Sequence, residues 1–187
     1  MSAGLYIPET AKWYSLLNQA QADSAHYLDV EVERYLADML FRFSCNVEGA
    51  LHYPAGGSSL EWNTAREHRL RRLQGAGERC LVTAGFFPEQ ANYAGLSLLH
   101  FIDRGRSVYH ELAEAIPGVA IYSYLDNNFM RMVDVLQRIG QLSGVCRSID
   151  LLQACELWQQ EGSTGGWLMI ESRTGSFPAA TASNLTH

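Results

Sequence analysis

The segment from Glu78 to Ala113 constrains the fold of this chain most, because it joins two strongly apolar stretches through one sharp break. The break is Gly85-Phe86-Phe87-Pro88, and its proline cannot continue a preceding helix. The second stretch carries apolar residues at helical spacing, among them Leu98, Ile102 and Leu112. The pattern therefore predicts a helix, a buried corner and a second helix.

The first of these stretches, from Cys80 to Phe87, fits a buried strand as well as a buried helix by periodicity alone. Helical signals on both sides favour the helix. In the second stretch, predicted as one helix over 91–116, Gly105 costs about 1 kcal/mol relative to alanine. We therefore expect a neighbouring element to approach closely at Gly105. Pro117-Gly118 ends this helix.

A continuous apolar stripe predicts a further helix between residues 28 and 43. Its members fall at i, i+4, i+7, i+8, i+11, i+12 and i+15, and they are Leu28, Val32, Tyr35, Leu36, Met39, Leu40 and Phe43. Acidic residues in the opening turns, such as Glu31 and Glu33, favour the helix dipole.

Four other helices are predicted from start and stop signals. One begins near Pro8, and one runs from the capping-box sequence at Ser58 to Gln74, where Gly75-Ala76-Gly77 is expected to end it. Another spans 125–142, and the last begins near Ser148. The last helix is expected to bury one face, made of Leu151, Leu152, Cys155 and Trp158.

Together these elements predict an all-α fold, a compact bundle of about six or seven helices in a single domain. The length of 187 residues suits one domain, and a hydrophobic fraction of 47% with 18% charged residues is typical of a globular chain. We expect residues 1–160 to form the helical domain. The segment 161–187 should be partly docked through Trp167-Leu168-Met169-Ile170 and then flexible.

Charge and the start of the chain limit the partners and the compartment. With 14 Lys and Arg against 20 Asp and Glu, the net charge of −6 disfavours nucleic acids and anionic membranes as partners. The chain has neither the pattern of a secretory signal at its start nor a run long enough to span a bilayer. We therefore expect a cytoplasmic protein, whose four dispersed cysteines act as small hydrophobic residues.

Two adjacent segments, Gly77–Leu81 and Ala84–Pro88, follow a G-D-x-x-L-x-x-x-G-x-F-P pattern, with Glu78 in place of the aspartate. Together with residues 105–113 and 151–158, they make the chain resemble a family of helical, mostly proteobacterial proteins. The similarity covers roughly residues 29–178, although 98–101 is more apolar than the family pattern. The resemblance implies a helical fold and a cytoplasmic location. It implies no activity, so it transfers no catalytic residue.

Five residues form the candidate binding site: Arg66, His100, Asp103, Arg106 and Tyr109. Arg66 shares a helix face with Leu70 and Leu73, so we expect it to be partly buried and paired with a carboxylate. Asp103, Glu48 and Glu78 are the alternatives for that partner. The wider basic run from Arg66 to Arg72 turns by roughly 100° per residue, which favours a solvated helix face over a phosphate or RNA surface.

Two His-x-x-Asp pairs, His26 with Asp29 and His100 with Asp103, have a spacing that facing helices can use to hold a metal. Di-iron bundles instead use Glu-x-x-His pairs, and the sequence contains none. Chance produces one or two such pairs in a chain with six histidines and many carboxylates. We therefore expect neither a metal nor another cofactor.

The sequence contains no nucleophile elbow and no phosphate-binding loop. We therefore expect a non-enzymatic regulator or adaptor that acts through contacts with a protein partner or with a second copy of itself. The alternative is a helical protein that binds a small molecule or metal, or an enzyme, with its site around the five candidate residues.

Overall fold

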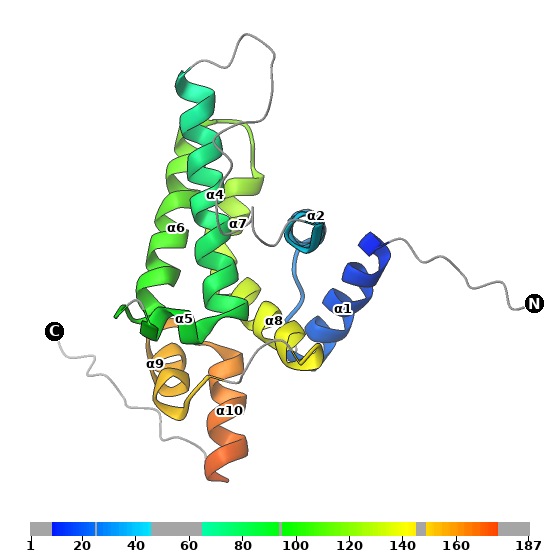
Figure 1. Cartoon of the computed structure of the whole chain (residues 1–187), viewed down its shortest axis with the longest axis vertical. Helices are drawn as coiled ribbons and strands as arrows, with labels where there is room; N and C mark the ends of the chain where they lie inside the picture. The colour runs from blue at the N-terminus through cyan, green and yellow to red at the C-terminus, as the bar shows by residue number, and fades with distance from the viewer. Residues whose placement is uncertain (1–8, 25, 46–64, 94, 145–148, 176–187) are drawn as a thin grey trace, which may run out of the picture.

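The computed structural model describes residues 9–24, 26–45, 65–93, 95–144 and 149–175, and every regular element within them is a helix (Figure 1). The helices are α1 (Glu9–Ser24), α2 (Val30–Cys45), α4 (Ala65–Phe86), α5 (Pro88–Tyr93), α6 (Leu98–Ala115), α7 (Ile121–Asn127), α8 (Phe129–Leu142), α9 (Leu151–Glu161) and α10 (Thr164–Thr174). The predicted all-α bundle is confirmed. The described residues hold more helices than predicted because two expected long helices are interrupted and the docked segment forms α10, although α4 joins two helices that the sequence predicts as separate.

The helices α4 and α6 lie side by side in opposite directions along the long axis of the molecule (Figure 1). The helix α8 crosses near the lower end of this pair, and α1 packs against both α2 and α8. The hairpin of α9 and α10 lies at the lower end, away from the beginning of α4. The beginning of α4 and the α9–α10 hairpin therefore lie at opposite ends of the molecule.

The core is densest where α4, α6 and α8 meet. Leu81, Ile102, Phe129 and Leu136 are fully buried there. A Cβ added at Gly105 would overlap the ring of Phe129, so the predicted close approach at this glycine is confirmed. At this junction glycine stabilises packing that any side chain would obstruct.

The predicted corner at Gly85-Phe86-Phe87-Pro88 is confirmed, since α4 ends at Phe86 and α5 begins at Pro88. The predicted end at Gly75-Ala76-Gly77 is wrong, because α4 continues through these residues. Gly77 is buried, and a Cβ there would lie 3.0 Å from the ring of Tyr109. This glycine admits the tyrosine ring of α6 and does not terminate the helix.

The predicted helix over 91–116 is interrupted between Tyr93 and Leu98, where the Ser97 side chain accepts the backbone N–H of His100 at 3.2 Å and caps α6. The predicted helix over 125–142 is divided at Asn128, which separates α7 from α8. Each interruption occurs at a polar residue that can satisfy free backbone groups at a helix end.

The last predicted helix is present as α9, but its predicted buried face is only partly correct, because Cys155 and Trp158 pack against the core while the two leucines do not. The side chains of Leu151 and Leu152 are exposed, by 44% and 70%, whereas Ala154 and Leu157 are fully buried. The reason is that α10 folds back onto the side of α9 that carries Trp158 and leaves the first turn of α9 exposed. The expected start at Ser148 lies outside the described residues, and Asp150 caps the helix through a capping box with Gln153.

The helix α10 lies within the segment predicted to dock on the bundle, and it does pack on α9. The rings of Trp158 and Trp167 contact one another across this hairpin, with centroids 5.3 Å apart. The predicted helix start near Pro8, the predicted start at Ser58 and the predicted flexible end of the chain fall outside the described ranges. Among the helices that the structure describes, none is both long enough and apolar enough to cross a membrane.

Candidate functional site

The five predicted site residues do not meet in one cavity. Tyr109 is fully buried, while His100, Asp103 and Arg106 are exposed on α6. Arg66 is exposed at the beginning of α4 and donates from Nη2 to the carbonyl oxygen of Ala115 at 2.8 Å. The five residues therefore have different surroundings and do not form one site.

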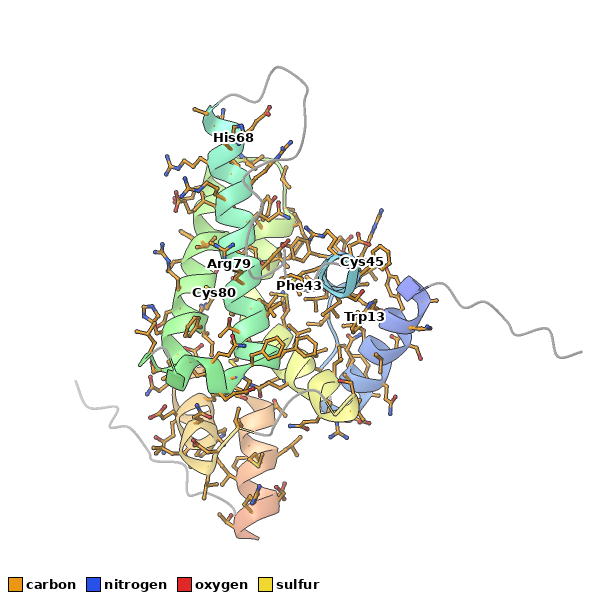
Figure 2. The ribbon with its side chains drawn as sticks, viewed as in Figure 1. Trp13, Phe43, Cys45, His68, Arg79 and Cys80 are labelled. Atoms are coloured by element: carbon orange, nitrogen blue, oxygen red, sulfur yellow. The ribbon has the colours of Figure 1, made fainter. Side chains whose placement is uncertain are left out.

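The expectation that Arg66 is partly buried and paired with a carboxylate is wrong. Its partner is a backbone carbonyl at the end of α6, where the last carbonyls of a helix have no partner inside the helix. The other cations of the Arg66–Arg72 run are exposed too, and His68 lies near the outer end of α4, away from Cys80 (Figure 2). This exposure agrees with a solvated helix face.

Arg106 connects three helices. Its Nη1 donates to Glu161 of α9 at 3.3 Å, and its Nε lies 3.7 Å from Oδ1 of Asp126 in α7. All three side chains are at least partly exposed, and ion pairs of this kind contribute little, typically up to about 1 kcal/mol. Arg106 thus helps to orient α9 against α6.

The two His-x-x-Asp pairs do not form a joint site. The Nε2 of His26 lies 3.1 Å from Oδ2 of Asp134 in α8, and His100 instead packs edge-on against the ring of Phe101. In the described ranges, no group of three or more histidine, cysteine or carboxylate side chains is arranged to hold a metal ion.

A buried carboxylate at the centre of α4 collects three hydrogen bonds that the sequence does not predict. Tyr35 donates to Oε1 of Glu78 at 2.8 Å, Arg42 donates to the same oxygen at 2.8 Å, and Gln74 donates to it at 3.0 Å. Glu78 is only 7% exposed. Charge-assisted bonds of this kind are stronger than neutral ones, so the Glu78 cluster fixes α2 against α4.

The two tyrosines beside Glu78 are held in their neutral form. Burial raises the pKa of Tyr35 well above its ordinary value, and the neighbouring Tyr109 and Glu78 raise it further. Burial also raises the pKa of Tyr109, whose hydroxyl lies 3.4 Å from that of Tyr35. Because Tyr35 donates to Glu78, its oxygen is free to accept from Tyr109, which gives a directed chain of hydrogen bonds.

A second buried carboxylate, Asp134 of α8, joins the α1–α2 connection to the α9–α10 turn. The hydroxyl of Ser163 donates to Oδ1 at 2.6 Å, and the backbone N–H of Thr164 donates to Oδ2 at 3.0 Å. His26 contacts the same Oδ2 from the other side. Ser163 also caps α10, because its oxygen accepts the N–H of Gly166 at 2.8 Å.

Serine, histidine and aspartate are the residues of a hydrolase triad, but their order in this Asp134 cluster is different. In a triad the serine bonds to the histidine and the aspartate orients that histidine. Here the aspartate lies between the other two, so the serine hydroxyl donates to the carboxylate and not to the imidazole. Ser163 is also fully buried. The arrangement orders three segments of the chain.

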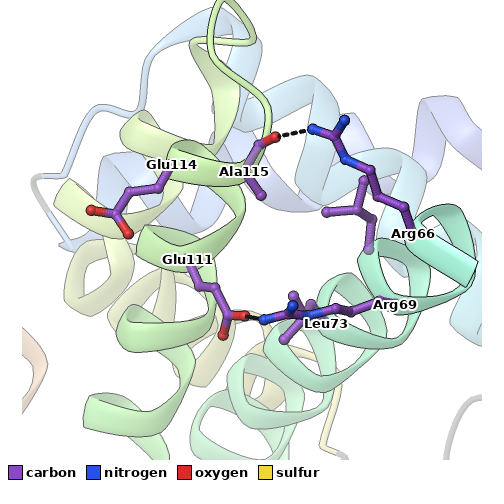
Figure 3. A pocket seen from close by; sticks show the side chains of 7 residues that line it. Arg66, Arg69, Leu73, Glu111, Glu114 and Ala115 are labelled. Carbon is purple, nitrogen blue, oxygen red and sulfur yellow. Dashed lines mark hydrogen bonds and ion pairs between the residues drawn. The ribbon is translucent and has the colours of Figure 1, made fainter.

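A groove of about 290 Å³ lies between the first half of α4 and the second half of α6 (Figure 3). Its lining residues are Arg66, Arg69, Leu70, Leu73, Glu111, Glu114 and Ala115. Arg69 donates to Glu111 at 2.6 Å, and this pair and the Arg66–Ala115 bond bridge the two helices on either side of the opening (Figure 3). Of the five predicted site residues, Arg66 is the one that lines this groove.

Large apolar side chains are exposed in two places where they neighbour one another in sequence. Leu151 and Leu152 begin α9, and Tyr27 lies just before α2, whose first residue is Val30, 76% exposed. Scattered apolar residues on a surface are ordinary, whereas contiguous apolar patches rimmed by polar residues are typical of contact surfaces. The sequence alone assigned Leu151 and Leu152 to the core.

Comparison with protein-family models, with curated proteins and with solved structures finds no match to this chain. The resemblance to helical proteobacterial proteins therefore stays a prediction.

Proposed function

We propose that this protein is a non-enzymatic adaptor or regulator that acts through protein–protein contacts, with the beginning of α9 as its contact surface. The observation that carries the proposal is the exposure of two consecutive leucines, Leu151 and Leu152, on a helix whose other apolar residues pack inward. We call these two leucines, with Asp150 and Glu156 beside them, the α9 edge.

The energetics of the α9 edge support this proposal. Burying a leucine side chain contributes about 1.5–3 kcal/mol, so two exposed leucines retain a large capacity to stabilise a contact. They are not needed to close the hairpin, because Ala154, Leu157 and Ile170 are buried within it. A partner that covers the α9 edge would gain this free energy without unfolding the hairpin.

The Asp134 cluster and one ion pair also support a role in presenting a surface. The Asp134 cluster holds the turn before α10, and Arg106 bonds to Glu161 at the end of α9. A contact surface on a fixed element loses less conformational entropy on binding than one on a loose segment. As the sequence predicts, the proposal names a protein partner and a cytoplasmic location.

The proposal is tested by comparing capture from the native host by the full chain and by a Leu151→Ser, Leu152→Ser variant. We expect the variant to lose a specific protein that the wild type captures, with an unchanged circular dichroism melting curve. The matched control is Leu96→Ser, which removes an exposed leucine from the connection between α5 and α6. Identical capture by wild type and variant would overturn the proposal.

A further inference from the structure

The α4–α6 groove has an apolar floor and a rim of both charges, with Arg66 and Arg69 on the α4 side and Glu111 and Glu114 on the α6 side. Leu70 and Leu73 are only partly buried, and the exposed Arg66 and Arg69 stand beside them on the same helix. The bond from Arg66 to Ala115 uses one of the five N–H donors of its guanidinium. Arg69 pairs with Glu111, and its guanidinium likewise has further N–H donors. A side chain that enters the groove from the α4 side should therefore be apolar, with a carboxylate close to these arginines.

The α9 edge has this chemistry at a matching spacing. Leu152 and Glu156 are separated by four residues, which places them about 6 Å apart along one face of α9. On α4, Arg69 and Leu73 have the same separation. When two such helices pack in opposite directions, leucine can meet leucine while glutamate meets arginine.

We infer that the α9 edge of one copy of this chain docks in the α4–α6 groove of a second copy. This inference rests on the proposed function, because it names the partner of the α9 edge. The groove and α9 lie at opposite ends of the molecule, so a chain cannot fill its own groove (Figure 1). Contacts through two different surfaces join copies head to tail, and they extend unless the rotation closes a ring.

The charge distribution favours this occupant. The described part of the α9–α10 hairpin with its cap carries Asp150, Glu156, Glu161 and Glu171 against Arg173. The first two turns of α4 carry mainly arginines. Opposite charges at the two ends speed encounter in the head-to-tail orientation and disfavour contact between like ends.

Sedimentation velocity of the full chain tests the inference directly. We expect larger species to form as the protein concentration rises, and added salt to weaken them because the charged rim is screened. Two double variants test the two surfaces. The groove variant carries Arg66→Glu and Arg69→Glu, and the edge variant carries Leu152→Arg and Glu156→Arg. In each, the dissociation constant for self-association should rise more than roughly tenfold. The charge-matched control is Arg71→Glu with Arg72→Glu, two exposed α4 residues that do not line the groove.

Mixing the two variants gives the sharpest result. The groove variant keeps an intact α9 edge, and the edge variant keeps an intact groove. One productive contact is therefore possible between them, and an equimolar mixture should form a one-to-one complex that does not grow further. A matching circular dichroism spectrum for each variant shows that it is folded.

Three outcomes would overturn self-association at this groove. One is a wild type that stays monomeric at every concentration, and another is a variant mixture that does not form the one-to-one complex. The third is self-association that Tyr27→Ser with Val30→Ser abolishes and the groove variant leaves intact. A monomeric wild type that still needs Leu151 and Leu152 to capture a different protein would remove only this inference and would leave the proposed function supported.

Discussion

Two buried carboxylates, Glu78 and Asp134, each accept hydrogen bonds from separate parts of the chain. Removal of either would leave buried donors unpaired, at about 1–3 kcal/mol for each group. The sequence offers Glu78 as one of three possible carboxylate partners of Arg66. It does not identify the residues that pair with Glu78, because Arg42 and Tyr35 come from α2, far away in the sequence.

The buried Tyr109 predicts a loss of stability in alkali. Its pKa is raised above the ordinary value of 10.0, mainly by burial, so the folded protein keeps a proton that the unfolded chain releases. The stabilising effect is complete below pH 10 and is lost as the pH rises further. Above pH 10, the free energy of unfolding of the wild type should fall as the pH rises. For Tyr109→Phe this fall should be less steep, by about 1.4 kcal/mol per pH unit.

Urea unfolding at several pH values between neutrality and strong alkali measures this change in slope. The matched control is Tyr27→Phe, since the ring of Tyr27 is 79% exposed and its hydroxyl meets water in the folded and unfolded chain alike. Equal slopes for Tyr109→Phe and the wild type would contradict the explanation from burial.

Between helices, the contact of α6 with α8 depends on Gly105. Gly105→Ala adds a Cβ where the Phe129 ring lies and 3.1 Å from Cβ of Cys80. The overlap should cost about 1–3 kcal/mol, although alanine favours the helix by about 1 kcal/mol. We expect a net loss of stability, measured by urea unfolding at neutral pH.

The control for this change is Ser107→Ala, on the exposed side of the same helix. Its effect should stay within about 0.5 kcal/mol, as for most surface substitutions. Equal stability of Gly105→Ala and Ser107→Ala would contradict the close contact between α6 and α8 at Gly105.

The helix α10 should depend on Ser163 in particular. Ser163→Ala removes the cap of α10 and one donor to Asp134, so local unfolding of α10 should become easier by about 1–3 kcal/mol. Amide hydrogen exchange in Trp167–Thr174 should accelerate about tenfold for each 1.4 kcal/mol.

Thr164→Ala is the control, because the bond from Thr164 to Asp134 uses the backbone N–H and survives the change. Faster exchange across the whole molecule in Ser163→Ala would contradict a local role for the cap.

The helices show which sequence patterns are sufficient to predict a buried face. The stripe of α2 predicts its buried face, with Val32, Leu36 and Met39 fully buried, because an amphipathic helix carries its own periodic signal. The exposed leucines of α9 carry the same signal, but none of the described helices covers them. The glycines near the centre of α4 were wrongly assigned to a helix end because the sequence does not show which ring packs against them.

Across the whole molecule, Cys80 reports on global opening, since it lies where α4, α6 and α8 meet. Burial raises the pKa of its thiol, and closed packing also excludes reagents. In a variant with serine at Cys146 and Cys155, a thiol reagent should modify Cys45 in the native state. Modification of Cys80 should require unfolding and rise with urea as the unfolded population does.

The exposed Cys45, at the end of α2, is the internal control for reagent activity. Native-state modification of Cys80 at the rate of Cys45 would show that this core opens locally. The measurement is a time course of labelling followed by mass spectrometry of the peptides.

The sequence by itself determines the helical class, the corner at Gly85-Phe86-Phe87-Pro88 and the need for a small residue at Gly105. These follow from periodicity and backbone restrictions within a few residues. The tertiary structure alone decides the partners of Glu78 and Asp134, the surroundings of Arg66 and the exposure of Leu152. The physical reason is that these features depend on which helix lies opposite, and that is set by packing between distant segments of the chain.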